Sequence, residues 1–173
     1  MITLVRNHIL GFILLVLLQA LVLDHLDLAN GWVVPYLYVL FIIALPFNTP
    51  RWATLLLGFA MGMAIDYFSS TPGMHASATV LMAWARLFML RLLAPRDGYD
   101  YTKRPNVPDM GLTWYMTFAG SLVLIHHLWL FFVEVYRFTD FFTTFLRALM
   151  SAAATLLLCL LAQALTSRGA RPR

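Results

Sequence analysis

The sequence predicts an all-helical membrane protein, a bundle of six transmembrane helices with both ends of the chain in the cytoplasm. The 173 residues are 61% hydrophobic and only 12% charged, with a mean hydropathy of +0.78, whereas soluble domains carry about 25% charged residues. Six apolar stretches approach the length of a membrane crossing, and lysine and arginine gather in alternate connections. A soluble fold of this size has no interior large enough for so much apolar surface.

The six apolar stretches are of unequal length. A crossing helix needs about 20 mostly apolar residues, with about 17 as the lower limit. The stretches cover approximately residues 5–23, 33–47, 52–68, 74–93, 112–133 and 141–165. The second is short, and Pro35 and Pro46 bracket it as helix edges; together with the third it could instead form a hairpin that does not span fully. No small-residue cleavage site follows the first stretch, which favours a retained helix over a signal peptide.

One connection differs from the others. The short connections carry turn residues, such as Asn30 with Gly31 and the run SSTPG at 69–73. Residues 94–111 instead hold six charged side chains and three prolines. This segment is predicted to be a cytoplasmic loop that joins two halves of three helices within a single membrane domain covering residues 1–173.

The basic residues predict the orientation of the bundle, because Lys and Arg are in excess on the cytoplasmic side of membrane proteins. With the N-terminus inside, the inner segments carry Arg6, Arg51, Arg91, Arg96, Lys103, Arg104, Arg168, Arg171 and Arg173. The outer connections carry Arg137, Arg147 a little way inside the last helix, Asp24, Asp27, Glu134 and Asp140. The basic charge therefore indicates topology and attraction to lipid headgroups, not nucleic-acid binding.

Charged side chains inside the apolar stretches are functional candidates, because a charge at membrane depth is costly. Gly58, Gly62 and Asp66 are spaced by four and share one helix face. Small residues on such a face let another helix approach closely. We expect a packing seam that ends in a carboxylate; alternatively, Asp66 only caps the turn that follows, or lies in interfacial water.

Arg86 and Arg91 lie in the inner half of the fourth stretch. Long basic side chains readily extend toward headgroups, so snorkelling is the favoured interpretation for both. For Arg86 the alternatives are a pair with a carboxylate or a contact with a partner helix.

His126 and His127 lie in the outer half of the fifth stretch, and Glu134 follows about two turns later. Hydrogen bonding within the bundle is the favoured role for both histidines. Adjacent residues on a helix point about 100° apart, so the two imidazoles are a poor pair of metal ligands, and nothing fixes the distance of His75 as a third nitrogen. No metal or other cofactor is predicted.

The outer ends of several stretches bring further candidates to one level. Arg147 with Asp66, His75 and Glu134 predicts a cluster of mixed charge, which would close an internal polar network or line a small cavity; charge pairing inside the bundle is favoured. No GxSxG, phosphate loop or HExxH motif is present. Asp66 with His126 is the one candidate pair for an intramembrane enzyme, and no catalytic residue is predicted.

Six short motifs follow one another along the chain: PYLY at 35–38, LPFNTPRW at 45–52, LGFAMGMAID at 57–66, TPGMHA at 71–76, RLLAPRDGY at 91–99 and IHHL at 125–128. Their order, with the size, the hydropathy and the plan of six stretches, resembles the MreD family of bacterial rod shape-determining membrane proteins. The resemblance covers nearly the whole chain. The positions that match the family pattern are Gly58, Gly62, Asp66, Pro72 and Gly73, and the role implied for them is helix packing or partner contact.

The resemblance implies a function beyond what the residues themselves indicate. MreD proteins are multi-pass proteins of the bacterial inner (cytoplasmic) membrane that act with MreC. Their complex links the MreB filament to RodA and penicillin-binding protein 2, which synthesise the lateral peptidoglycan wall. They are scaffolds or regulators without known chemistry of their own. The fold implied is also similar to the substrate-binding subunits of ECF vitamin transporters.

Three functions from different classes remain open at this point. The preferred one is a scaffold of cell shape. The second is a vitamin-binding subunit of a transporter, which needs a cavity of roughly 300 Å³ or more; the sequence offers no aromatic-rich outer loop to cap it. The third, an intramembrane enzyme, needs two catalytic groups that face each other at one depth.

Overall fold

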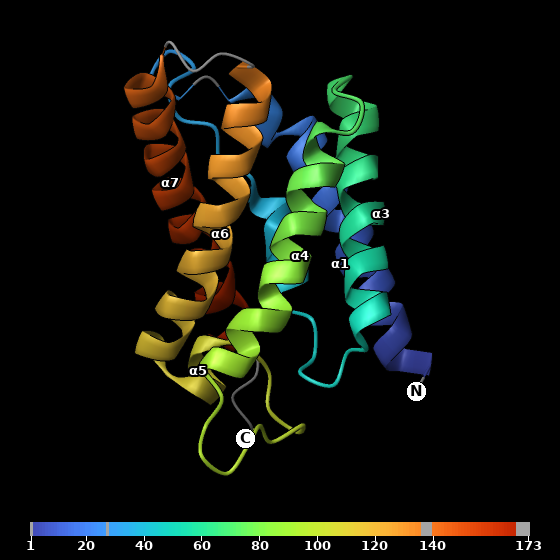
Figure 1. Cartoon of the computed structure of the whole chain (residues 1–173). Coiled ribbons are helices and arrows are strands. Elements are labelled where there is room, and N and C mark those ends of the chain that lie inside the picture. Colours follow the sequence, from blue (N-terminus) through green and yellow to red (C-terminus); the bar gives the residue numbers. More distant parts are fainter. Residues whose placement is uncertain (1, 27, 136–139, 169–173) are drawn as a thin grey trace.

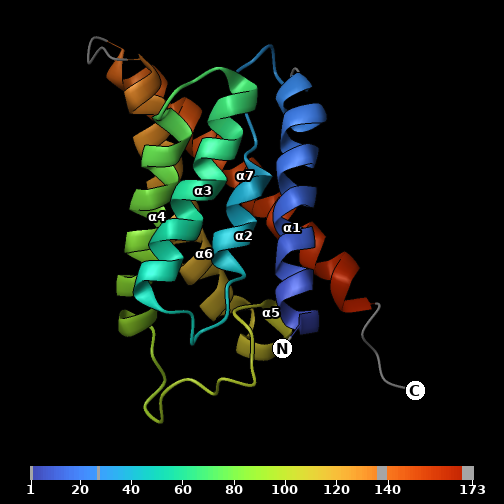
Figure 2. The ribbon, with the colours of Figure 1, turned by 90° about the vertical axis from the view of Figure 1, so that its right-hand side faces the viewer.

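The chain folds into a bundle of long helices (Figures 1 and 2). The first two long helices run in the same direction, and from the second one onward the direction alternates. In this computed structural model the backbone is described at residues 2–26, 28–135 and 140–168, and the side chains at 9–26, 28–135 and 140–165. The helices are α1 (Ile2–Leu21), α2 (Leu40–Ile43), α3 (Arg51–Ser69), α4 (Met74–Leu92), α5 (Val107–Met110), α6 (Leu112–Val135) and α7 (Phe141–Arg168), with 3₁₀ turns at Leu23–His25 and Leu37–Val39.

Five of the six predicted stretches form long helices, and their ends differ from the predicted ends by three residues at most. Within the described part of the chain, three of these helices are long and apolar enough to cross a membrane: Arg51–Ser69, Leu112–Val135 and Phe141–Leu165. The helix α4 is as long as α3 but contains Arg86 and Arg91. The prediction of an all-helical bundle with membrane-length helices is therefore confirmed.

The prediction of a helix over residues 33–47 is wrong. This stretch, hereafter the central segment, begins extended and is helical only over Leu37–Val39 and Leu40–Ile43. The reason lies in Pro35, which has no N–H to donate and which disfavours helical backbone angles at Val34. Pro46 then prevents the short helix from continuing.

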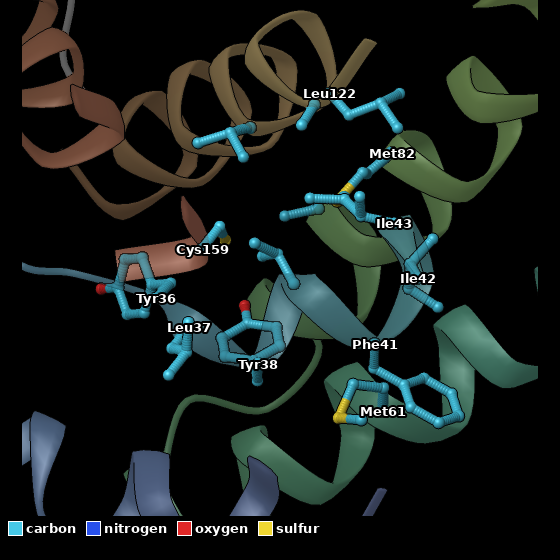
Figure 3. Close-up of a cluster of buried hydrophobic side chains, with 14 of the residues drawn as sticks. Tyr36, Leu37, Tyr38, Phe41, Ile42, Ile43, Met61, Met82, Leu122 and Cys159 are labelled. Carbon is cyan, nitrogen blue, oxygen red and sulfur yellow. The ribbon is translucent and has the colours of Figure 1, made fainter. Parts of the chain in front are cut away.

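The central segment runs through the middle of the bundle, between the long helices (Figure 2). Most of its side chains from Tyr36 to Ile43 are buried. Figure 3 shows Tyr36, Tyr38, Ile42 and Ile43 with Met61 of α3, Met82 of α4, Leu122 of α6 and Cys159 of α7 around them. Non-helical backbone at membrane depth is tolerated where protein surrounds it, and this segment has such surroundings.

Side chains from α1 and α7 satisfy the backbone of the central segment. The N–H of Val34 donates to Ser151 Oγ at 3.0 Å, and the N–H of Tyr36 donates to Thr155 Oγ1 at 2.9 Å. Ser151 and Thr155 are four residues apart and therefore lie on one face of α7. Gln19 of α1 accepts from the N–H of Leu37 at 2.9 Å and donates to the Pro35 carbonyl at 3.1 Å. These bonds replace the ones that a helix would have made internally.

The glycines of α3 pack directly against α4. A Cβ added at Gly58 would lie 2.9 Å from Ala83 Cβ, and one added at Gly62 would lie 2.6 Å from the backbone nitrogen of Ala76. Real Cβ atoms do not approach so closely, so only glycine allows this separation of the two helices. The glycine face is thus a packing seam within the chain.

Two ends of the bundle are distinguished below. The short-turn end carries the α3–α4 turn at residues 70–73, and the long-loop end carries residues 93–106, which lie beyond the helices at the bottom of Figure 1. The start of α1 and the end of α7 both lie toward the long-loop end (Figure 2).

Candidate functional site: a buried tyrosine–histidine cluster

The hydroxyl of Tyr38 bridges two buried histidines. Its oxygen lies 3.0 Å from His75 Nδ1 and 2.8 Å from His126 Nε2. A phenol has one proton to donate. Tyr38 therefore donates to one imidazole and accepts from the other, so one of the two nitrogens carries a proton and the other does not. The bridge joins the central segment to α4 and α6 through a single proton-sharing oxygen.

A second chain of hydrogen bonds runs from α6 to α7. His127 Nδ1 lies 2.8 Å from the Val123 carbonyl, which can only accept, so this nitrogen carries the proton. His127 Nε2 lies 3.0 Å from Thr155 Oγ1. The Thr155 hydroxyl accepts from the N–H of Tyr36 and is left to donate to Nε2 of a neutral His127. The His127 and Thr155 side chains thus have hydrogen-bond partners for all their polar atoms while both remain neutral.

The ring of Tyr36 fills the space between the histidines. Its centroid lies 5.3 Å from that of His75, 6.0 Å from His126 and 5.4 Å from His127. Phe131 lies against the same ring at 6.3 Å. Edge-to-face contacts at these distances are favourable aromatic packing. The cluster of Tyr36, Tyr38, His75, His126, His127 and Thr155, hereafter the Tyr38 cluster, is a packed assembly.

One atom of the cluster has no partner. His126 Nδ1 is buried and makes no hydrogen bond within the described residues. A buried N–H group without a partner is rarer in proteins than a buried acceptor without one. The arrangement of lower cost has the proton on His126 Nε2, where Tyr38 accepts it, with Tyr38 donating to His75.

Asp66 binds the start of α4. Its carboxylate accepts from the N–H groups of Gly73 at 3.1 Å, His75 at 2.9 Å and Ala76 at 2.9 Å, and from the Thr71 hydroxyl at 3.0 Å. A negative charge at the beginning of a helix is favourable because the first N–H groups are otherwise unpaired. The expected seam therefore ends in a carboxylate that caps the following helix, and Asp66 is buried rather than in interfacial water.

The predicted outer cluster of mixed charge does not assemble. Glu134 is exposed, and no ion pair connects it to another side chain of the described ranges. Arg147 donates to the Gly31 carbonyl at 3.1 Å and lies over the Phe131 ring, 5.0 Å from its centroid. Asp66 makes its hydrogen bonds to the α3–α4 turn and the start of α4 rather than to His126, so the candidate catalytic pair does not meet. The sequence predicted correctly that these side chains lie toward the same end of the bundle. The direction in which each one points depends on the rotation of its helix, which residue spacing alone does not determine.

Arg86 does not snorkel. It is fully buried, and its Nη2 donates to the carbonyls of Leu45 and Pro46. In the part of the chain with described side chains it meets no carboxylate either. Arg91, one turn and a half further on, is exposed, as snorkelling requires.

The remaining predicted positions lie at the surface. Pro72 and Gly73 are exposed in the short turn, and Gly73 has φ +86°, a left-handed conformation that favours glycine. Of the basic and acidic residues used for the orientation, Arg6, Asp27, Arg137, Arg168, Arg171 and Arg173 lie outside the described side chains.

An apolar groove of about 600 Å³ lies on the outer face of the α3–α4 pair, away from the histidines. Its walls include Phe59 and Met63 of α3 and Val80 and Trp84 of α4. Around the Tyr38 cluster, by contrast, the interior is occupied by side chains with almost no exposed surface. The cluster is therefore closely packed among its described neighbours.

Tyr38, Thr155 and Gln19 were not among the residues predicted from the sequence. A signal was present, since each is a polar residue inside an apolar stretch. Among the described residues, no group of three His, Cys, Asp or Glu side chains has an arrangement that could hold a metal ion. Chemically, the cluster can share protons and hold four segments, the central segment with α4, α6 and α7, in fixed positions.

Fold and site define a class: an all-helical protein with apolar helices of membrane length around a buried, mostly neutral polar centre. Comparison of the chain with protein-family models, with curated proteins and with solved structures finds no match.

Proposed function

We propose that the chain is a six-crossing protein of the MreD type, a non-enzymatic scaffold and regulator of cell shape and lateral peptidoglycan synthesis in the bacterial cytoplasmic membrane. Its proposed partners are an MreC-like protein and, through it, the MreB filament, RodA and penicillin-binding protein 2. The ordered motifs that begin with PYLY at 35–38 support the type.

One observation supports this role most directly: many polar groups in the half of the bundle toward the short-turn end have partners within the bundle. The carboxylate of Asp66 accepts four hydrogen bonds, two from the α3–α4 turn and two from the first turn of α4, and the hydroxyl of Tyr38 has two histidine partners. Polar groups engaged in this way rigidify a bundle, and a rigid bundle suits a protein that positions partners.

The charge distribution supports cytoplasmic placement of the long-loop end. The described basic residues of that end are Arg51, Arg91, Arg96, Lys103 and Arg104. At the other end Arg147 is accompanied by Asp24, Glu134 and Asp140. This asymmetry is the one expected when the long-loop end faces the cytoplasm, and the central segment then makes the second of six crossings.

The transporter-subunit alternative lacks a supporting observation. It places a ligand at the outer level of the bundle, where Tyr36 packs against His75 and His126. A vitamin would have to displace these rings. We therefore put forward the scaffold alone.

The test of this proposal is a clean deletion in a rod-shaped host. We expect the cells to become round, and we expect the wild-type chain, crosslinked in native membranes and purified, to recover an MreC-like protein. A deletion strain that keeps its rod shape and width would contradict the proposal.

Absence of chemistry has its own test in the same strain. A Tyr38→Phe, His126→Gln variant removes the bridging hydroxyl and one of its two histidine partners, and it keeps side chains of similar size. Produced at the wild-type level, it should restore the rod shape. Failure to restore shape by a variant that still folds and still recovers the partner would indicate a chemical role for the cluster.

A further inference from the structure

A second polar centre lies toward the long-loop end, around Arg86. This side chain has 0% exposed surface, yet only its Nη2 atom has partners, the carbonyls of Leu45 and Pro46. Its Nε and Nη1 atoms are buried and make no hydrogen bond within the described residues. Three N–H donors of a permanently charged group are thus without an acceptor.

The acidic residues of the neighbouring loop are engaged elsewhere or lie in solvent. Asp100 accepts from the backbone and hydroxyl of Thr102 at 2.9 and 2.7 Å, and Asp109 accepts from the backbone of Arg104 at 2.8 Å. Asp97 is exposed. A buried guanidinium without a counter-charge is costly, and arginine does not relieve the cost by losing its proton.

Tyr99 contributes a fourth donor to the same place. Its hydroxyl is buried without a partner in the described part of the chain, while residues 94–98 and Asp100 around it are exposed. Its ring stacks on Phe47 with 4.4 Å between centroids, and Trp114 contacts both rings. Burial raises the pKa of the Tyr99 phenol, whereas the side chain of Trp114 and the charge of Arg86 lower it. Arg86 bonds the carbonyls of Leu45 and Pro46, and Tyr99 stacks on the next residue, Phe47, so both side chains lie at the same stretch of backbone.

We infer that Arg86 and Tyr99 form a binding site for a phosphate group at the long-loop end of the bundle. The three free guanidinium donors and the phenol make four donors, and a phosphate monoester offers three unesterified oxygens to receive them, against two in a carboxylate. Charge-assisted hydrogen bonds of arginine to phosphate are among the strong ones.

Two sources supply this chemistry, a lipid phosphate headgroup and free phosphate. Arg86 lies six residues before the end of α4, Leu92, which is about 9 Å at 1.5 Å per residue. A headgroup entering beneath Tyr99 is within reach of a long arginine side chain at that depth. The exposed basic residues of this end, among them Arg91 and Arg96, would attract either source.

The experiment measures ligand binding to the purified full chain after delipidation in detergent. The probes are dioleoyl phosphatidic acid, dioleoylglycerol, which differs from it only by the missing phosphate, and inorganic phosphate. We expect phosphatidic acid to bind and dioleoylglycerol not to. Inorganic phosphate that binds as tightly as the lipid would identify the soluble source and still support the site.

Tyr99→Phe keeps the ring stack and removes one donor, so we expect phosphatidic acid to bind about tenfold more weakly. The matched control is Tyr101→Phe, in the same loop but 70% exposed, which should leave the affinity unchanged. Arg86→Lys should abolish most of the binding. Two results would each overturn the inference. The first is that both lipids bind equally and inorganic phosphate does not bind; the second is that Tyr99→Phe binds phosphatidic acid as tightly as the wild type. The assay needs no partner protein, so its outcome is independent of the proposed scaffold role.

Discussion

Replacing Thr155 with valine removes one hydroxyl from the bundle and changes the side-chain volume very little. The hydroxyl accepts from the N–H of Tyr36 at 2.9 Å and contacts His127 Nε2 at 3.0 Å. An orphaned buried N–H costs about 1–3 kcal/mol, and interhelical hydrogen bonds in membrane proteins contribute about 0.6 kcal/mol on average. We therefore expect Thr155→Val to lower the free energy of unfolding by about 2 kcal/mol, roughly thirtyfold in the equilibrium constant.

The assay is reversible unfolding of the purified protein in mixed micelles. The matched control is Thr117→Val on α6, because the exposed Thr117 hydroxyl bonds only the carbonyl of Thr113 in its own helix. The control should change stability by less than about 0.5 kcal/mol, and Thr155→Ser, which keeps the hydroxyl, should retain most of the stability. Thr155→Val as stable as Thr117→Val would refute the claim that side chains hold the central segment.

Two further predictions concern the α3–α4 hairpin and use the same unfolding assay. Gly62→Ala places a methyl group against the backbone of α4, so it should lower the free energy of unfolding by about 1–3 kcal/mol. The control is Gly120→Ala, where the added methyl group meets only a side chain at 3.7 Å. This control should be neutral or stabilising by up to about 1 kcal/mol. Equal changes in stability for Gly62→Ala and Gly120→Ala would contradict the conclusion that the glycine face of α3 packs directly against α4. Asp66→Asn turns an amide group toward N–H donors and should lower the free energy of unfolding by about 2 kcal/mol or more. The control Asp97→Asn, in the exposed loop, should leave the stability unchanged. An Asp66→Asn protein of wild-type stability would show that the cap is dispensable.

Hydrophobic pattern and turn chemistry were sufficient to predict the long helices. The ends of α3 and α4, for instance, follow from Pro50, from the SSTPG turn and from the polar residues after Leu93. The glycine spacing in α3 also predicted a close packing face. Such features are local, and local patterns determine them.

The central segment could not be predicted in the same way. Pro35 and Pro46 marked its limits, but only the bundle supplies the partners that make extended backbone tolerable there. Those partners are Gln19, Ser151 and Thr155, of which the last two are more than 110 residues away in sequence. Likewise, the burial of Arg86 depends on the carbonyls of Leu45 and Pro46, which lie about 40 residues away in sequence, and local patterns do not show that they meet α4.

The central claim of this account is that residues 33–47 cross the membrane inside the bundle without forming a membrane-length helix. Substituted-cysteine labelling in intact cells tests it, with single cysteines at Ala29, Asn48 and Tyr101 in a chain whose native cysteine, Cys159, is buried. A membrane-impermeant maleimide should label position 29 from outside, and it should label positions 48 and 101 only after the membrane is permeabilised. Labelling of positions 29 and 48 from the same side would contradict the account.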